Sequence, residues 1–205
     1  MSSQKFFHNT KTLPIDQFFE NVLFNKKIGY YSSKIPFGKK GDFITSPGVS
    51  YLFSEMIGIW LISTWSSLGK PKKFNIVELG PGDGSLIKIL IKTFKQFPEF
   101  NKAVNIFLYE KSKFLKNLQK KNINNSNIKW IKDFTCLRKG PVIFFGNEFF
   151  DAIPIKQFIY KEGLLMEKYY SLNKKNKIKE IYKKASDKDF SKIKTFTTLK
   201  HLKFF

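Results

Sequence analysis

The feature that most constrains this chain is a short stretch in which an apolar run ends, three glycines alternate and a helical pattern begins. The run Phe74–Leu79 predicts a buried strand, and residues 86–97 carry apolar side chains at helical spacing. Gly80, Gly82 and Gly84 lie between them. Glycine lets the backbone turn sharply and leaves room for a ligand, and the first turn of a helix presents free N–H groups. The stretch therefore predicts a strand–loop–helix unit that binds a ligand.

The spacing of the glycines indicates the class of ligand. A dinucleotide-binding loop has the pattern G-x-G-x-x-G, which places the pyrophosphate at the helix N-terminus. In this chain the third glycine comes one position early, and Ser85 stands where that pattern needs glycine. A G-x-G-x-G loop preceded by an acid is the pattern of S-adenosylmethionine sites, where the acid can face the cationic amino-acid end of the cofactor. We therefore expect Glu78, Gly80, Gly82 and Gly84 to bind S-adenosylmethionine; the alternative is a plain strand-to-helix turn.

The residues that follow repeat the alternation of strand-like and helical patterns. Apolar strand-like runs occupy Val104–Tyr109, Ile128–Ile131 and Val142–Phe145, and a helical pattern over 113–120 separates the first two. Alternation of this kind predicts an α/β fold, with a Rossmann-like parallel sheet and helices on both faces. Three later runs are expected to form short strands or a hairpin: 156–160, 164–172 and 177–182.

The front of the chain is expected to form a helical layer. Thr12 is a good N-cap with Pro14 in the first turn, so a helix is predicted to start there. Ser46, which precedes a proline, predicts the start of a second, long helix that ends near Ser67. The predicted division of the chain is a helical N-terminal extension (1–72), a Rossmann-like domain (73–182) and a polar tail (183–205).

The net charge of +21 raises the possibility of nucleic-acid binding. The basic residues are spread along the chain, however, and Arg138 is the only arginine among the 37. Proteins that read bases or grip phosphates usually use the planar fork of arginine. We therefore expect no specific nucleic-acid partner. A nucleic-acid methyltransferase stays an alternative, because such charge attracts polyanions non-specifically.

Few residues are available for metal or nucleophilic chemistry. Cys136 is the only cysteine, and His8 and His201 are the only histidines. We expect no metal site, so carboxylates, amides and backbone groups must serve instead. The apolar stretch 51–68 is interrupted by Glu55 and by several serines, and it falls short of the ~20 apolar residues that span a bilayer. It predicts a buried or groove-lining helix and no transmembrane segment.

Two acidic residues follow later predicted strands. Glu110 ends the run that includes Val104–Tyr109, where a carboxylate can accept hydrogen bonds from both ribose hydroxyls of a nucleoside. The alternative is an ordinary solvated strand end. Asp133 follows the next strand, at a place where an acid that contacts adenine is often found. It could equally be a plain loop residue.

A further polar cluster follows the fourth predicted strand. In open α/β sheets, ligands bind beyond the carboxyl ends of the strands, near the switch in strand order. This rule places Asn147, Glu148 and Asp151 beside the reacting methyl group. Two carboxylates could hold a guanidinium group or accept its proton. They could equally cap the next helix and leave Phe149 and Phe150 in the core.

Together these stretches resemble the MidA family, which includes mitochondrial complex I assembly methyltransferases and bacterial relatives. The matching residues are Gly29-Tyr30-Tyr31, the run from Phe37-Gly38 to Gly41-Asp42-Phe43-Ile44-Thr45-Ser46-Pro47, then Ser50, Phe53 and Glu55, and the stretches 77–84 and 147–154. The resemblance covers roughly residues 13–160. It implies a class I enzyme that methylates a protein arginine, with a subunit of the respiratory NADH dehydrogenase as substrate. The implied compartment is the cytoplasm of a bacterium or the mitochondrial matrix of a eukaryote.

By the same matching, Gly80, Gly82, Gly84 and Glu110 are implied to bind the cofactor. The loop that contains Asp42, Thr45 and Ser46 is implied to lie over the cofactor or the acceptor.

Two departures from the family pattern bear on activity. Gly48 stands where the family usually has glutamate. A class I sheet also normally has about three strands after the fourth, and no pattern after Tyr182 supplies them. The strand Val142–Phe145 is then expected to have an uncovered apolar edge, unless the hairpin after it or another chain covers it. A truncated, non-catalytic module that binds the cofactor or a partner is therefore an alternative.

Overall fold

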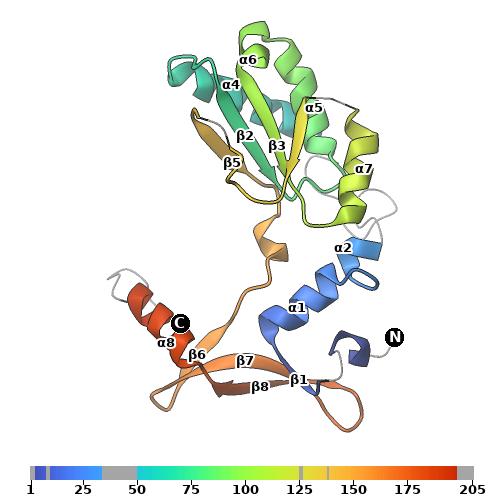
Figure 1. Ribbon diagram of the computed structural model, residues 1–205, viewed down its shortest axis with the longest axis vertical. Helices are drawn as coiled ribbons and strands as arrows, with labels where there is room; N and C mark the ends of the chain where they lie inside the picture. Colours follow the sequence, from blue (N-terminus) through green and yellow to red (C-terminus); the bar gives the residue numbers. More distant parts are fainter. Residues whose placement is uncertain (1–2, 8–9, 34–49, 125–126, 138, 198–205) are drawn as a thin grey trace. The chain divides into compact units, whose positions relative to one another are not determined.

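The computed structural model describes residues 3–7, 10–33, 50–124, 127–137 and 139–197. The chain divides into two compact units (Figure 1). One unit is Leu23–Ile153, and the other combines Met1–Val22 with Pro154–Phe205. This division differs from the predicted boundaries, because a strand near the N-terminus pairs with a strand of the C-terminal region.

The unit Leu23–Ile153 is built on a four-stranded parallel sheet in the order β4-β3-β2-β5. Its strands are β2 (Phe74–Leu79), β3 (Val104–Tyr109), β4 (Ile128–Ile131) and β5 (Val142–Phe145). Its helices are α2 (Tyr30–Ser33), α4 (Tyr51–Ser67), α5 (Ser85–Lys95), α6 (Pro98–Ala103), α7 (Lys113–Ile123) and the 3-10 helix η2 (Phe150–Ala152). The four strands have the predicted bounds, and the Rossmann-like fold is confirmed.

The strand order places a topological switch between β2 and β5. The chain moves outward from β2 to β3 and β4, and then returns to the other side of β2 to form β5. Ligands bind in the crevice beyond the carboxyl ends of strands at such a switch. The glycine loop after β2 and the segment after β5 both begin there.

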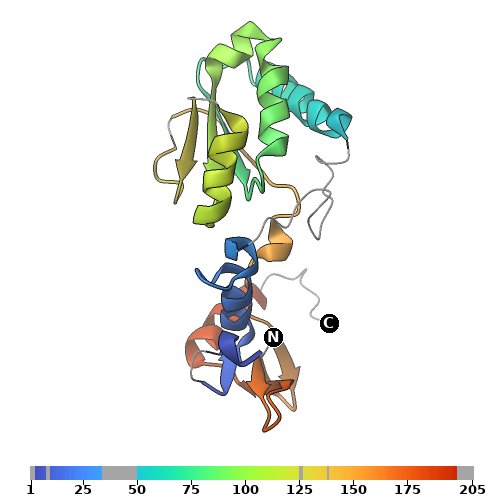
Figure 2. The same cartoon turned by 90° about the vertical axis from the view of Figure 1, so that its right-hand side faces the viewer.

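Helices cover one face of this sheet (Figure 2). The buried core there joins sheet residues to residues of α4, α5, α6 and α7, among them Leu61, Ile76, Leu90 and Phe100. The long helix α4 packs closely on α5 where Gly58 meets the side chain of Thr93. Among the described residues, no helix is long and apolar enough to cross a membrane.

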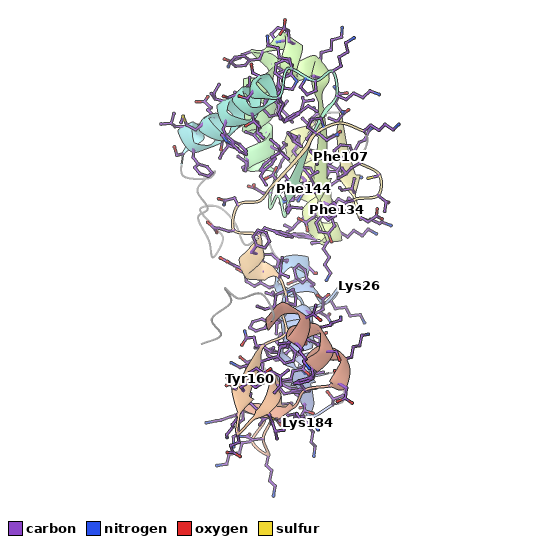
Figure 3. The ribbon with its side chains drawn as sticks, turned by 90° about the vertical axis from the view of Figure 1, so that its left-hand side faces the viewer. Lys26, Phe107, Phe134, Phe144, Tyr160 and Lys184 are labelled. Carbon is purple, nitrogen blue, oxygen red and sulfur yellow. The ribbon has the colours of Figure 1, made fainter. Side chains whose placement is uncertain are left out.

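The opposite face has a smaller apolar cluster, centred on Val77, Phe107 and Ile131. The side chains that pack against it come from strands and from the loop after β4, so the expectation of helices on both faces is wrong for the described residues. The connection from β4 to β5 contains no helix in its described part. Phe134 and Phe144 lie on this face with Phe107 (Figure 3), and each is a little under half exposed.

The edge strand β5 pairs with β2 through residues Val142–Phe145. No other strand pairs with β5 among the residues that the structure describes. The later hairpin strands pair with one another instead. The predicted uncovered edge is therefore present in the described part of the chain.

The second unit contains a four-stranded antiparallel sheet in which β7 is the longest strand. Its strands are β1 (Thr12–Pro14), β6 (Phe158–Lys161), β7 (Leu164–Leu172) and β8 (Ile178–Lys184). The other elements are η1 (Ser3–Phe6), α8 (Asp187–Thr197) and the start of α1 (Ile15–Phe24). The three predicted strand runs after residue 155 are confirmed, whereas the expected weakly patterned tail contains the end of β8 and the helix α8.

The first helix begins later than predicted. Thr12 and Pro14 belong to β1, which pairs with β7 antiparallel, and α1 begins at Ile15. Proline can occupy an edge strand because it need not donate to the ladder there. Leu13 joins Phe7 and Phe18 in a small core, and this burial explains why the segment is extended.

The described part of the long helix α4 begins at Tyr51, after the start that the sequence predicts. Ser50 is its N-cap and accepts a hydrogen bond from the N–H of Phe53 over 3.4 Å. The predicted start at Ser46 lies outside the described residues.

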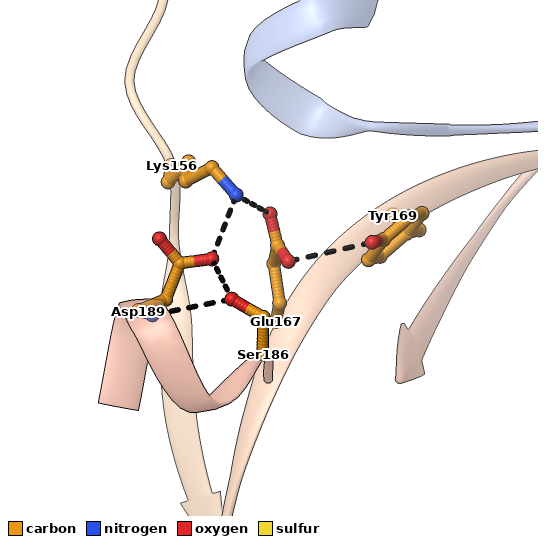
Figure 4. A network of polar contacts seen from close by, with 5 residues as sticks. All are labelled: Lys156, Glu167, Tyr169, Ser186 and Asp189. Carbon is orange, nitrogen blue, oxygen red and sulfur yellow. Dashed lines mark hydrogen bonds and ion pairs between the residues drawn. The ribbon is translucent and has the colours of Figure 1, made fainter. Parts of the chain in front are cut away.

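A buried carboxylate fixes α8 to the antiparallel sheet (Figure 4). Glu167 on β7 is 3% exposed and accepts a hydrogen bond from Lys156 over 2.7 Å. Lys156 also donates to Asp189 on α8 over 3.0 Å. Partial burial acts to lower the pKa of Lys156, but its bonds to these two carboxylates outweigh that effect and raise the pKa.

We predict that Lys156→Met destabilises the protein by about 1–3 kcal/mol, because Glu167 then stays buried without its cation. Urea denaturation measures the change. The control is Lys168→Met, whose partner Glu180 is 41% exposed and which should cost less than about 1 kcal/mol. Equal losses in the two variants would contradict the assigned role of Glu167.

Candidate functional site

The loop between β2 and α5 requires glycine for its backbone conformation. Gly80, Gly82 and Gly84 have φ angles of 61°, 57° and 84°. Residues that carry a Cβ rarely adopt positive φ angles of this kind. The N–H of Gly80 donates to the carbonyl of Tyr109 on β3 over 3.0 Å, and this bond ties the loop to the neighbouring strand.

Two of these glycines also make room for side chains of the protein itself. A Cβ at Gly80 would lie 2.7 Å from Cδ2 of Phe149. A Cβ at Gly84 would lie 2.9 Å from Cδ1 of Ile123 on α7. Close packing is therefore a reason for glycine at both positions, beside the ligand contact that the sequence predicts. The contact with a cofactor stays a prediction.

Glu78, at the end of β2, has an unusual environment for a carboxylate. It is 3% exposed, and its Oε2 has no hydrogen-bond partner among the described residues. Burial, reinforced by the nearby charge of Asp83, raises the pKa of Glu78 to about 8. The side chain is thus mostly neutral at pH 7, and a cationic group placed beside it would favour its ionised form.

The raised pKa of Glu78 predicts that the Glu78→Gln variant is more stable than the wild type near pH 8. The unfolded chain releases the Glu78 proton near pH 4.5, whereas the folded chain holds it until about pH 8, so rising pH favours unfolding across this window. Glutamine removes that loss. Urea denaturation at about pH 5 and about pH 8 should show an advantage at the higher pH that shrinks at the lower one. Glu55→Gln, at an exposed position on α4, is the control; the same pH trend in both variants would contradict the prediction.

Glu110 lies just after β3, and its carboxylate is held in place. Its Oε1 accepts a hydrogen bond from the N–H of Ser112 over 2.7 Å, and its Oε2 accepts one from Gln119 over 3.0 Å. Burial raises the pKa of Glu110, and these hydrogen bonds partly offset that effect. The Nε2 of Gln119 also donates to the carbonyl of Gly82 over 2.8 Å. The structure therefore brings Glu110 beside the glycine loop, as a shared nucleoside site requires.

Three predicted site carboxylates lie near one phenol. The pKa of Tyr31, on α2, is raised first by burial and then by the charges of Asp151, Glu110 and Glu148. The backbone carbonyl of Tyr31 accepts a hydrogen bond from Ser112, the N-cap of α7, over 2.7 Å. The carboxylates after β5 and after β3 thus lie within electrostatic reach of the same tyrosine.

The sequence did not single out Tyr31 or Gln119 as site residues. Tyr31 stands in the matching stretch Gly29-Tyr30-Tyr31, which is a signal that could have found it. Gln119 stands among lysines and asparagines on α7, where a polar residue is expected to face solvent. The helical spacing does offer a signal, since Gln119 lies four residues after Leu115 and four before Ile123, on the buried face of α7.

The segment after β5 has a strained backbone. Glu148 has a φ of 54°, which is uncommon for a residue other than glycine and is concentrated at functional sites. Asn147 is half-buried, whereas Glu148 and Asp151 are exposed. Phe150 is 73% exposed, so the alternative in which it lies in the core is wrong.

Asp133 organises the turn after β4. Its Oδ1 accepts hydrogen bonds from the N–H and the hydroxyl of Thr135, and these bonds lower its pKa. The side chain is exposed. Its contact with adenine stays a prediction. Asp42, Thr45 and Ser46 lie outside the described residues.

The model of one protein family matches residues 56–202, which is most of the chain. The family is described as "Putative S-adenosyl-L-methionine-dependent methyltransferase". The chain belongs to this methyltransferase family. The cofactor that the glycine spacing predicts is the one that the family description names, and the MidA resemblance is confirmed.

Similar sequences include curated animal members of this methyltransferase family. The chain is 33% identical over 174 residues to human "Protein arginine methyltransferase NDUFAF7, mitochondrial", with 73% of this chain and 40% of that protein covered. It is 32% identical over 184 residues to the Drosophila melanogaster homologue, with 78% and 41% covered. The chain thus spans about two fifths of the length of these relatives.

Two solved structures share the fold. A Burkholderia thailandensis protein bound to S-adenosyl-homocysteine has a TM-score of 0.74 at 19% identity, with 94% of this chain and 53% of that chain covered. A native structure of a protein from the same organism has a TM-score of 0.71 at 18% identity, with 93% and 51% covered.

Proposed function

We propose that this chain binds S-adenosylmethionine and transfers its methyl group to a protein arginine. The observation that carries the proposal is the hydrogen bonding that joins the glycine loop to Glu110, with the carboxylates after β5 close enough to act on the same tyrosine as Glu110. Gln119 links Gly82 to Glu110, and Tyr31 lies within the electrostatic reach of Glu110, Glu148 and Asp151. A cofactor site and an acceptor site therefore meet at one end of the sheet.

The described residues fit the cofactor in chemical terms. Glu78 has a buried carboxylate oxygen without a partner among the described residues, and the cationic amino group of the cofactor would supply one. Glu110 is held with acceptor capacity left for the ribose hydroxyls. Gly80, Gly82 and Gly84 would form the floor of the site, and Asp133 would contact the adenine. When bound, the cofactor supplies a methyl group activated by its positive sulfur.

The acceptor site is assigned to Asn147, Glu148 and Asp151. Two carboxylates can orient a guanidinium group by charge-assisted hydrogen bonds. Ionised carboxylates can also take up the proton that the methylated nitrogen loses. The contribution of these residues to the rate would be to hold the nitrogen in line with the methyl carbon.

Support for arginine comes from the names of the curated relatives, which are protein arginine methyltransferases. A subunit of the respiratory NADH dehydrogenase is the substrate that the family resemblance implies. The same relatives are named as mitochondrial, and that compartment is our proposal for a eukaryotic source. In a bacterium, the cytoplasm is the corresponding proposal.

The cofactor assignment predicts that Glu110→Gln weakens the binding of S-adenosylhomocysteine about 10- to 100-fold, because charge-assisted bonds to the ribose are lost. Isothermal titration calorimetry on the full chain measures the dissociation constant. Glu99→Gln, at an exposed position that pairs with Lys70, is the matched control and should bind as the wild type does. Unchanged affinity in Glu110→Gln would remove Glu110 from the site.

The acceptor assignment predicts that Glu148→Gln and Asp151→Asn, unlike Glu110→Gln, slow methyl transfer without weakening cofactor binding. Each should reduce methyl transfer to arginine-containing peptides about 100- to 10,000-fold while cofactor affinity stays the same, because general acid–base groups contribute on that scale. Transfer of radiolabelled methyl groups measures the rate. Equal rates in the wild type and both variants would contradict the assignment.

A second candidate function is a binding module without turnover, and it is favoured by the edge of β5 that pairs with no strand among the described residues. Tight cofactor binding without transfer to any arginine peptide would support that candidate. Methyl transfer to RNA or DNA, in place of peptides, would instead support a nucleic-acid methyltransferase.

A further inference from the structure

We infer that Gln119 is a positioning residue that couples the glycine loop to the ribose-binding carboxylate. This inference rests on the proposed function, in which Glu110 accepts the ribose hydroxyls. Gln119 is 0% exposed, although it lies on a helix whose neighbouring residues are mostly lysine and asparagine. A buried amide is costly unless its hydrogen bonds are satisfied, so its partners indicate what it does.

Both hydrogen bonds that the Gln119 amide donates are directed at the proposed site, and its oxygen accepts one from the strand β4. Its Nε2 donates to the carbonyl of Gly82 over 2.8 Å and to Oε2 of Glu110 over 3.0 Å. Its Oε1 accepts from the indole N–H of Trp130, on β4, over 2.9 Å. One side chain on α7 therefore connects the loop after β2, the end of β3 and the strand β4.

Trp130 determines which way the amide faces. The indole N–H can only donate a hydrogen bond, so the oxygen of Gln119 must face it. The two hydrogens of Nε2 are then left for Gly82 and Glu110, which both offer oxygen acceptors. The arrangement is satisfied in this orientation alone, and it fixes the distance between the loop and the carboxylate.

The same bonds indicate that Gln119 acts through its neighbours. Both of its N–H groups are used within the protein, so none remains for a ligand. Ser112 holds the other oxygen of Glu110, and the two bonds together set the plane of the carboxylate. Loss of Gln119 should therefore affect the ribose contact and leave the rest of the ligand site in place.

The charge state of Glu110 provides an independent readout. Burial raises the pKa of Glu110, whereas the hydrogen bonds from Ser112 and Gln119, the backbone of Lys111 and the charge of Lys116 lower it. The Tyr31 phenol is also within its electrostatic reach. Removing the Gln119 donor should raise the pKa of Glu110 further. When the pH is lowered, Glu110 is then protonated earlier, so ligand affinity should be lost at a higher pH in the variant than in the wild type.

The test compares two ligands, S-adenosylhomocysteine and its 2′,3′-dideoxy analogue, by calorimetry on the full chain. Gln119→Met keeps the side-chain volume but removes the polar contacts. We expect about a tenfold loss of affinity for S-adenosylhomocysteine, and less than about a threefold change for the analogue, which cannot use Glu110. We also expect the midpoint at which acid weakens the binding of S-adenosylhomocysteine to move to a higher pH. Gln96→Met, at an exposed position after α5, is the matched control and should bind both ligands as the wild type does.

Trp130→Phe is the second variant, in case Gln119→Met does not fold. It keeps both donors of Gln119 but removes the bond that orients the amide, so a smaller loss confined to S-adenosylhomocysteine is expected. Unchanged affinity, or equal losses for the two ligands, would overturn the positioning role. If Glu110→Gln binds S-adenosylhomocysteine as the wild type does, the assignment of Glu110 to the ribose fails. If Glu110→Gln binds weakly but the Gln119 and Trp130 variants bind as the wild type does, the ribose assignment stands and the positioning role of Gln119 fails.

Discussion

The parallel pairing of β2 with β3 on one side and β5 on the other is the constraint on which the site depends. Because the strands are parallel, the segments that follow them emerge at the same edge of the sheet. The glycine loop, Glu110 and the Asn147–Asp151 segment are far apart in the sequence and are brought to that edge by these pairings. Burial of apolar residues against α4 and α5 stabilises the sheet and hence the site.

Within this frame, buried polar groups define the chemistry more than charge does. The chain has a net charge of +21, yet the groups closest to the proposed cofactor are carboxylates and an amide. Glu78 is kept mostly neutral at pH 7 by burial, and Glu110 is kept oriented by Ser112 and Gln119. Such groups are costly to bury unless they are paired, so their arrangement is specific.

Much of the fold could be predicted from local pattern. The bounds of β2, β3, β4 and β5 follow from apolar runs, because a strand buried on both faces reads as a continuous apolar segment. The helix predicted at Thr12 failed because capping signals are local, whereas the pairing of β1 with β7 is not. The C-terminal helix α8 was missed for a related reason: the Glu167–Lys156–Asp189 contacts that hold it come from separate segments.

The sequence by itself determined the four strands of the parallel sheet, the glycine loop and the acids that follow those strands. These features are local, since each depends on residues within one turn or one strand. Only the tertiary structure decided that Gln119 is buried between Gly82, Glu110 and Trp130, and that Phe149 packs on Gly80. It also decided that helices cover one face of the described sheet. The spacing within α7 places Gln119 on the buried face, but the partners of Gln119 and Phe149 depend on the packing of distant segments, which no spacing within a single element encodes.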